Sequence, residues 1–240
     1  MQKRRNLARR IGKGLLILVG VLFVGAACAH LAWKYSGDDT PKLVIDKQGI
    51  QVYTIKTPGQ SLLKIKAVRV VKSTLDRAAA AHLDGSLENC HDWIPDCYES
   101  LAVKHWDPQA RNYVQLWKEK FPEPFSPREF LLNTQFTQAA PGQPITVEFT
   151  AAPDAAPKSD CCYRLTHMHA VWTLDPIDQD DVRVTLMQDI DVGLPYFLFN
   201  DEAPRAVYGA FEDLPRLYAK TKYDTVSLQT IYGGQPIVAE

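Results

Sequence analysis

Residues 163–192, YRLTHMHAVWTLDPIDQDDVRVTLMQDIDV, form the stretch that decides the fold. Two segments within it, residues 163–174 and 182–192, have the composition of strands, and the acidic turn sequence DPIDQDD lies between them. Strands that follow one another directly along a chain favour antiparallel pairing. We therefore predict that these two segments are neighbouring strands of an antiparallel sheet.

The chain beyond these strands changes to a helical pattern. Asn200 can cap a helix, and the acidic residues at 201 and 202 favour the positive end of a helix. We expect this helix to span residues 201–217, with Pro215 kinking or shortening its end. Small residues at 206, 209 and 210 leave room beside it. Apolar side chains recur along one helical face, at Ala203, Val207, Phe211, Leu214 and Tyr218.

Upstream, the sequence predicts further strands with a helical segment between them. Residues 64–67 (Lys, Ile, Lys, Ala) alternate as a strand does. Ser73 is expected to begin a helix that includes residues 77–83, and residues 87–93 form another helical turn. The other expected strands are residues 51–57, 62–71, 99–106, 113–121, 128–137 and 144–150. One antiparallel sheet with a long helix laid across it would bury both apolar faces, which predicts an α+β fold.

The first 13 residues carry six basic side chains and no acidic one, and an uncharged apolar run follows over residues 15–29. This order is typical of a translocation signal, and the basic end should stay in the cytoplasm. Residues 15–33 are long enough to remain as a transmembrane anchor. Alternatively, Ala27-Cys28-Ala29 fits a cleavage site before His30, or Cys28 is lipidated as in a lipoprotein. We expect a protein that is anchored in the inner membrane with a periplasmic domain, or exported to the periplasm after cleavage.

The expected organisation follows from these segments. Residues 1–35 are the export or anchor segment, residues 36–42 a linker, residues 43–220 the domain and residues 221–240 a tail. The net charge is −1, and no phosphate-binding glycine loop or nucleic-acid motif is present, so nucleic acid is not an expected partner.

Four cysteines remain outside the export segment, and an exported domain meets an oxidising compartment. They allow three pairings, and simple buried thiols are an equal alternative. A bond between the neighbours Cys161 and Cys162 would be strained, whereas Cys90 and Cys97 can pair across a short loop.

Several strings, in this order and spacing, resemble the START family of lipid-transfer domains. The resemblance covers about residues 46–218. Glu129 stands where the family usually has aspartate, and one glycine of the last string is missing. The strings are GIQVY at 49–53, HDWIPD at 91–96, PFSPRE at 124–129, WTLDP at 172–176 and DIDVGLPYFLFN at 189–200.

The resemblance implies a helix-grip fold, in which a curved antiparallel sheet wraps around a long C-terminal helix and encloses an apolar tunnel. It implies binding, and transfer between membranes, of a phospholipid, fatty acid or sterol-like molecule, without enzymatic activity. The partners would be that hydrophobic molecule and the membrane. The equal alternative to a tunnel is a solid core that is filled by the apolar face of the C-terminal helix. The candidate ligand-binding residues are Arg128, Glu129, Arg164, His167, Trp172, Val207, Phe211 and Leu214. For four of these candidates, the alternative to ligand binding is a position on the surface or in a structural salt bridge. These four are Arg128, Glu129, Arg164 and His167.

Two other functions compete with lipid binding. His167 with Glu129 or Asp189 would suit an acid–base pair in a cavity enzyme of the cyclase or hydratase type. An envelope interaction module with a filled core is the third possibility. His167 and His169 share one face of a strand, but no third ligand is fixed by spacing, so we expect no metal and no cofactor.

Overall fold

The computed structural model describes residues 2–94 and 96–227. The chain divides into two compact units. One unit contains the described residues up to Thr40 together with Lys56–Ser61, and the other contains Pro41–Ile55 and the residues from Leu62 onward.

The first unit is built on one long helix, α1 (Gln2–Tyr35). Over Gly12–Tyr35 this helix is long and apolar enough to cross a membrane, and none of that segment is buried inside the protein. An anchor and a signal sequence both have these properties, so the helix agrees with either expectation.

The end of α1 packs on the chain segment Lys56–Ser61, within the same unit. The Lys56 ammonium donates to the carbonyl oxygens of Lys34 (3.1 Å) and Ser36 (3.2 Å), and also to those of two residues in its own segment. The Trp33 indole donates to the Ser61 carbonyl at 2.8 Å. These bonds hold the residues that follow the apolar helix in a defined conformation, although the sequence predicts a simple linker there.

The second unit contains one ten-stranded sheet with the path β1-β2-β3-β10-β9-β7-β6-β5-β4, and β8 pairs with β6 outside this path. Every pairing is antiparallel except that of β8 with β6. The strands are β1 (Lys42–Lys47), β2 (Ile50–Ile55), β3 (Lys64–Lys72), β4 (Cys97–Asp107), β5 (Asn112–Glu119), β6 (Arg128–Gln138), β7 (Ile145–Ala151), β8 (Tyr163–Arg164), β9 (His167–Pro176) and β10 (Asp181–Asp191).

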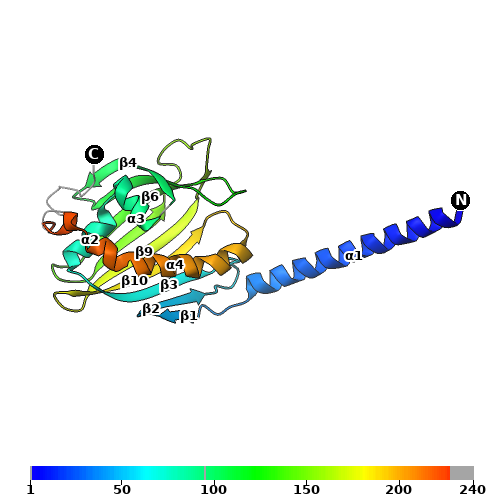
Figure 1. Ribbon diagram of the computed structural model, residues 1–240, viewed down its shortest axis with the longest axis horizontal. Helices are drawn as coiled ribbons and strands as arrows, with labels where there is room; N and C mark the ends of the chain where they lie inside the picture. The colour runs from blue at the N-terminus through cyan, green and yellow to red at the C-terminus, as the bar shows by residue number, and fades with distance from the viewer. Residues whose placement is uncertain (1, 95, 228–240) are drawn as a thin grey trace. The chain divides into compact units, whose positions relative to one another are not determined.

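Four helices complete the described chain: besides α1, these are α2 (Leu75–Leu83), α3 (Leu87–Trp93) and α4 (Tyr196–Tyr218), with a short 3-10 turn at Thr221–Tyr223. Figure 1 shows α4, in orange, lying across one face of the sheet. Its buried side chains, among them Val207, Phe211 and Leu214, join a core to which β3, β7, β9 and β10 contribute. The predicted arrangement of one antiparallel sheet and one long C-terminal helix is confirmed.

The ends of the helices differ from the sequence prediction. Helix α4 begins at Tyr196, after Pro195, rather than at 201. Asn200 lies inside the helix, and its side chain accepts a hydrogen bond from the Leu63 backbone (2.9 Å) instead of capping the helix. Pro215 does not shorten it, since the helix continues to Tyr218 with its buried face intact. Thr74, rather than Ser73, caps α2 by accepting from the Arg77 backbone.

The four cysteines of the second unit form two disulfide bonds, each between cysteines that are close in sequence. Cys90 in the middle of α3 is joined to Cys97 at the start of β4. Cys161 is joined to Cys162, the pairing that the sequence spacing disfavoured. Cys28 on α1 is a free thiol. Of the expected tail, residues 228–240 lie outside the described part of the chain.

Candidate ligand-binding cavity

A cavity of about 680 Å³ lies between α4 and the sheet. A second cavity of about 170 Å³ shares several lining residues with it, including Trp93, Trp117 and Trp172, so the two adjoin. Small-molecule sites in proteins typically occupy about 300–1,000 Å³. The lining of the larger cavity is mainly apolar, with Phe130, Met168, Leu186 and Ile190 from the sheet. The space is therefore large enough, and apolar enough, for a hydrophobic molecule.

Helix α4 leaves this space open because small side chains face it. Ala203, Ala206, Gly209 and Ala210 all line the larger cavity. A methyl group added at Gly209 would meet no atom within 4 Å. A larger residue at these positions would occupy the volume that the helix now leaves free.

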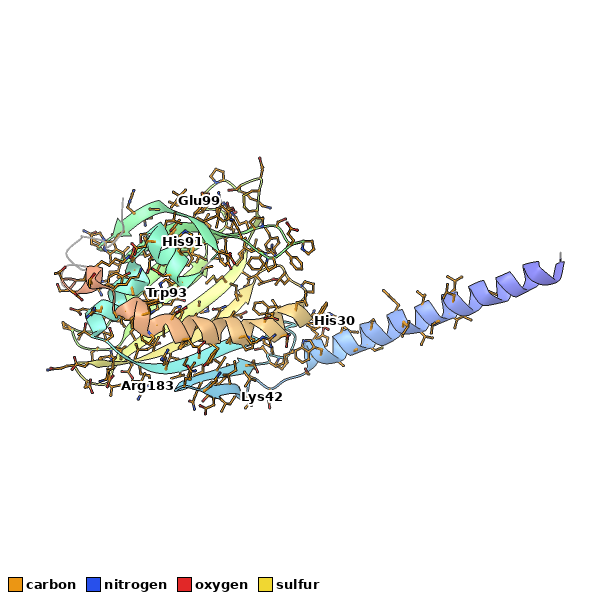
Figure 2. The ribbon with its side chains drawn as sticks, in the orientation of Figure 1. His30, Lys42, His91, Trp93, Glu99 and Arg183 are labelled. Carbon is orange, nitrogen blue, oxygen red and sulfur yellow. A yellow bond between two sulfur atoms is a disulfide. The ribbon has the colours of Figure 1, made fainter. Side chains whose placement is uncertain are left out.

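An aromatic cluster lies where the two cavities adjoin. Trp93 and Trp172 lie with ring centroids 5.5 Å apart, and the His82 ring lies within 4.9 Å of both. Figure 2 labels Trp93 on α3, beside α4. On its far side, Trp172 stacks on Phe211 at 5.4 Å. Burial lowers the pKa of His82 to about 3, so this ring is neutral, and it forms a hydrogen bond of 2.8 Å with the Tyr218 hydroxyl.

Glu119, at the end of β5, is a partly buried acid on the wall of the larger cavity. Burial raises the pKa of its carboxyl to about 7, and the nearby negative charge of Asp96 adds to the rise. The positive charge of Arg128, the residue opposite Glu119 in the backbone register of β5 and β6, opposes the rise. The cavity thus contains a carboxyl group that is easily protonated.

We predict opposite effects of Glu119 and His82 on the pH dependence of stability. Between pH 4.5 and about 7, the native state keeps a proton on Glu119 that the unfolded chain has released, so stability falls as pH rises. Below pH 6.5 and above about 3, the unfolded chain binds a proton on His82 that the native state excludes, so stability falls as pH falls. The two effects offset each other between pH 4.5 and 6.5, where both groups change their protonation on unfolding.

The Glu119→Gln substitution should separate these effects. It removes the first effect, so the free energy of unfolding at pH 8 should rise by roughly 2 kcal/mol relative to the wild type, and the variant should lose stability from pH 8 to pH 5. Urea denaturation of both proteins at the two pH values measures this. An unchanged pH profile in the variant would show that Glu119 does not titrate in this range.

Two of the candidate residues from the sequence, Trp172 and Val207, line the cavity. Phe211 and Leu214 are fully buried in the core behind it. His167 is not among the lining residues and is half-exposed, with its ring 2.9 Å from Asp189. The reason is the alternation of β9, which turns Met168 and Trp172 to the cavity and the histidines to the opposite face.

The three charged candidates form structural contacts. Arg128 donates to the Val192 carbonyl (2.5 Å) and to the Ser126 carbonyl, and its guanidinium lies over the Phe121 ring at 4.3 Å. Glu129 is fully buried and accepts from Arg164 at 2.6 Å. The same guanidinium donates to carbonyl oxygens of the loop at 153–157, so the pair holds this loop against the sheet.

The remaining sequence hypotheses do not assemble a site in the structure. No group of three or more potential metal ligands occurs among the residues that the structure describes. Of the two acid–base pairs considered, His167 and Asp189 are in contact at 2.9 Å, but neither residue lines a cavity. Glu129 is paired with Arg164 instead and does not line a cavity either. Lining residues that the sequence interpretation missed are Trp117, Glu119 and Gln188. Alternation on β5 and β10 would have placed them on the inner face.

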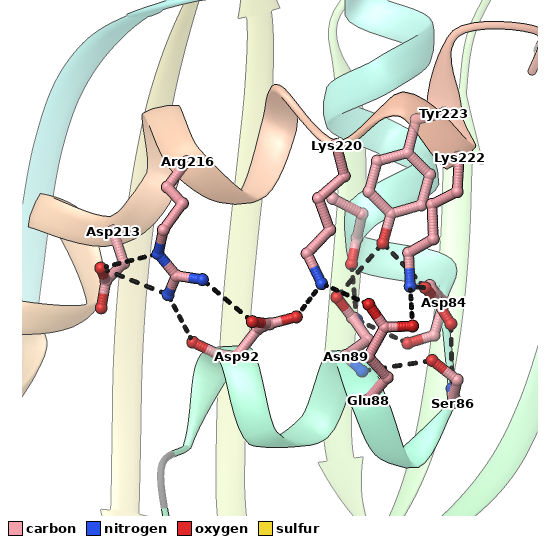
Figure 3. A network of polar contacts seen from close by, with 11 residues as sticks. Asp84, Ser86, Glu88, Asn89, Asp92, Asp213, Arg216, Lys220, Lys222 and Tyr223 are labelled. Carbon is pink, nitrogen blue, oxygen red and sulfur yellow. Dashed lines mark hydrogen bonds and ion pairs between the residues drawn. The ribbon is translucent and has the colours of Figure 1, made fainter.

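The C-terminal end of α4 is fixed by a polar network (Figure 3). Arg216 pairs with Asp92 of α3 at 2.9 Å, and Lys220 pairs with Asp92 and Glu88. Beyond the helix, the Tyr223 hydroxyl donates to the buried Asp84 carboxylate at 2.8 Å. This network ties α4 to α3, whose Trp93 lines both cavities.

The fold is shared with solved structures of lipid-transfer domains. No family model and no curated protein matches the sequence. A STAR-related lipid transfer protein fragment from Xanthomonas axonopodis is 24% identical with a TM-score of 0.67, covering 76% of this chain and 100% of that one. Human STARD10 is 13% identical with a TM-score of 0.66, over 78% of this chain and 76% of that chain. Human StAR-related lipid transfer protein 5 is 14% identical with a TM-score of 0.62, over 84% and 96%. The chain therefore has the START helix-grip fold.

Proposed function

We propose that this protein binds a hydrophobic ligand, such as a phospholipid, a fatty acid or a sterol-like molecule, in its internal cavity and transfers it between envelope membranes. The observation that carries the proposal is the apolar cavity of about 680 Å³ between α4 and the sheet. Removing about 300 Å² of apolar ligand surface from water would contribute roughly 7 kcal/mol, so no dedicated polar motif is needed for binding. A filled core, as in a pure interaction module, would leave no such space.

The fold and the N-terminal helix support the same proposal. Solved proteins with this fold are named for lipid transfer. The apolar segment Gly12–Tyr35 would hold the domain at a membrane, or export it, and the basic residues before it would place the domain on the periplasmic side. Residues 43–220 would then form the lipid-binding domain of an anchored or exported protein.

Photo-crosslinking in membranes tests this proposal. The full chain would be reconstituted in vesicles that contain a phospholipid with a diazirine in its acyl chain, illuminated and mapped by peptide mass spectrometry. We expect labelled residues on β9, β10 and α4, around Met168, Leu186 and Val207, because these side chains face the cavity. Labelling confined to Gly12–Tyr35 would mean that only the apolar helix contacts lipid.

A further inference from the structure

The charged side chains on the cavity walls are all acidic. The larger cavity is lined by Glu119, Glu202, Glu212 and Asp213, and the smaller one by Asp84. Among the described residues that line either cavity, none is a lysine or an arginine. His82 is uncharged because burial lowers its pKa to about 3. An anionic group inside this cavity would therefore meet negative charge and no positive side chain on the wall.

Two arginines that contact lining residues are occupied by other groups: Arg128 lies over the Phe121 ring, and Arg69 bonds the backbone of Glu212. Arg128 donates to the carbonyl oxygens of Ser126 and Val192. Arg69 donates to the carbonyl of Phe211 at 2.5 Å and to that of Glu212 at 3.1 Å. Redirecting either guanidinium to a ligand would leave these carbonyl groups unpaired, which costs free energy.

Most of the acidic residues already have a partner. Glu202 pairs with Arg205 and Asp213 pairs with Arg216. Glu212 accepts from the Tyr208 hydroxyl at 3.0 Å, and the buried Asp84 pairs with Lys222 at 2.6 Å. The cationic partners partly neutralise Glu202, Asp213 and Asp84, and Glu212 accepts from a neutral hydroxyl.

Glu119 differs from the other acidic residues. No hydrogen bond or ion pair with another described residue reaches its carboxylate, although it is half-buried on the wall of an apolar cavity. Burial raises its pKa to about 7, the negative charge of Asp96 adds to the rise, and the charge of Arg128 opposes it only in part. A buried carboxylate is stabilised by a donor that brings positive charge, and such hydrogen bonds are about twice as strong as neutral ones.

We propose that the cavity selects hydrophobic molecules whose polar end is a cationic amine, which donates to the Glu119 carboxylate, and that it disfavours anionic polar ends. This inference rests on the proposed function and specifies the ligand class for the same site. The apolar wall around Trp172 and Ile190 holds the hydrocarbon part, and Glu119 at the end of β5 receives the ammonium group.

Three amphiphiles with the same hydrocarbon chain test this selectivity. Octadecylamine, octadecanol and octadecanoic acid differ only in their polar ends. Each would be titrated separately into the full chain in one nonionic detergent, with native mass spectrometry counting the bound molecules. We expect the wild type to bind the amine most tightly, the alcohol next and the acid least. Glu119→Gln should weaken binding of the amine about tenfold and leave that of the alcohol unchanged.

Comparing the variant with the wild type in the same detergent cancels the partitioning of each amphiphile into micelles. Asp154→Asn is the matched control, because it removes one negative charge from an exposed loop residue and should change no affinity. Binding of the alcohol to Glu119→Gln shows that the variant is folded. The wild-type order tests the inference without any variant.

The outcomes separate this inference from the proposed function. If the acid binds the wild type as tightly as the amine, or if Glu119→Gln leaves the amine unaffected, the headgroup inference is overturned while cavity binding stands. If none of the three amphiphiles binds, the headgroup inference is overturned, and the photo-crosslinking with the diazirine phospholipid decides separately whether the cavity binds lipid.

Discussion

Ala210→Trp should lower lipid transfer between vesicles by more than tenfold. Ala210 lies on α4 and lines both cavities, so the indole would occupy the volume that a ligand needs. Leaving about 100 Å² of ligand surface in water would cost roughly 2.5 kcal/mol, which exceeds a tenfold change in affinity. The measurement is the rate at which a fluorescent phospholipid leaves donor vesicles that carry the full chain.

The control for this variant is Arg205→Trp on the same helix. The Arg205 side chain is exposed, and among the described residues its ion pairs are with Asp201 and Glu202, one turn away. Surface pairs of this kind contribute little to stability, so this variant should transfer lipid at the wild-type rate. Equal transfer by Ala210→Trp, Arg205→Trp and the wild type would mean that the ligand does not occupy the space beside α4.

Glu129→Ala should lower the free energy of unfolding by about 3–5 kcal/mol, the usual cost of breaking a buried ion pair by removing one partner. Glu129 is fully buried and accepts from Arg164 at 2.6 Å and from the Ser159 hydroxyl. Without it, the Arg164 guanidinium would remain buried with an uncompensated charge. Urea denaturation followed by circular dichroism measures the loss.

An exposed pair on the same sheet provides the comparison. Asp175 and Arg183 pair at 3.0 Å, with side chains that are 38% and 49% exposed. Asp175→Ala should cost less than about 1 kcal/mol, because solvent screens such pairs. Similar losses in Glu129→Ala and Asp175→Ala would contradict a structural role for Glu129 and would reopen its role as a ligand contact.

The strands were predictable because alternation is local in sequence. Ile65 and Ala67 of β3 are buried between more exposed lysines, as their spacing predicts. β1 (Lys42–Lys47) was missed because it is an edge strand with little burial and no clear alternation. The start of α4 was placed five residues late because Asn200 has the chemistry of a helix cap but bonds to a neighbouring strand.

The cavity was only partly predictable. Small residues such as Gly209 indicated free space beside α4, but that a cavity remains depends on the packing of β5, β9 and β10 against the helix. Glu119 has an ordinary sequence context, and its raised pKa depends on burial and on the distant residues Asp96 and Arg128. His167 was an attractive candidate because histidine is reactive, yet strand alternation alone would have placed it away from Trp172.

Native mass spectrometry of the full chain, purified in mild detergent from the membranes in which it is made, tests most directly whether the cavity carries a ligand. We expect one apolar molecule per chain, which organic extraction would identify, and Ala210→Trp should purify without it. A folded wild-type protein that is empty on purification, and that stays empty after incubation with lipid vesicles, would contradict the proposal that the space between α4 and the sheet is a ligand site.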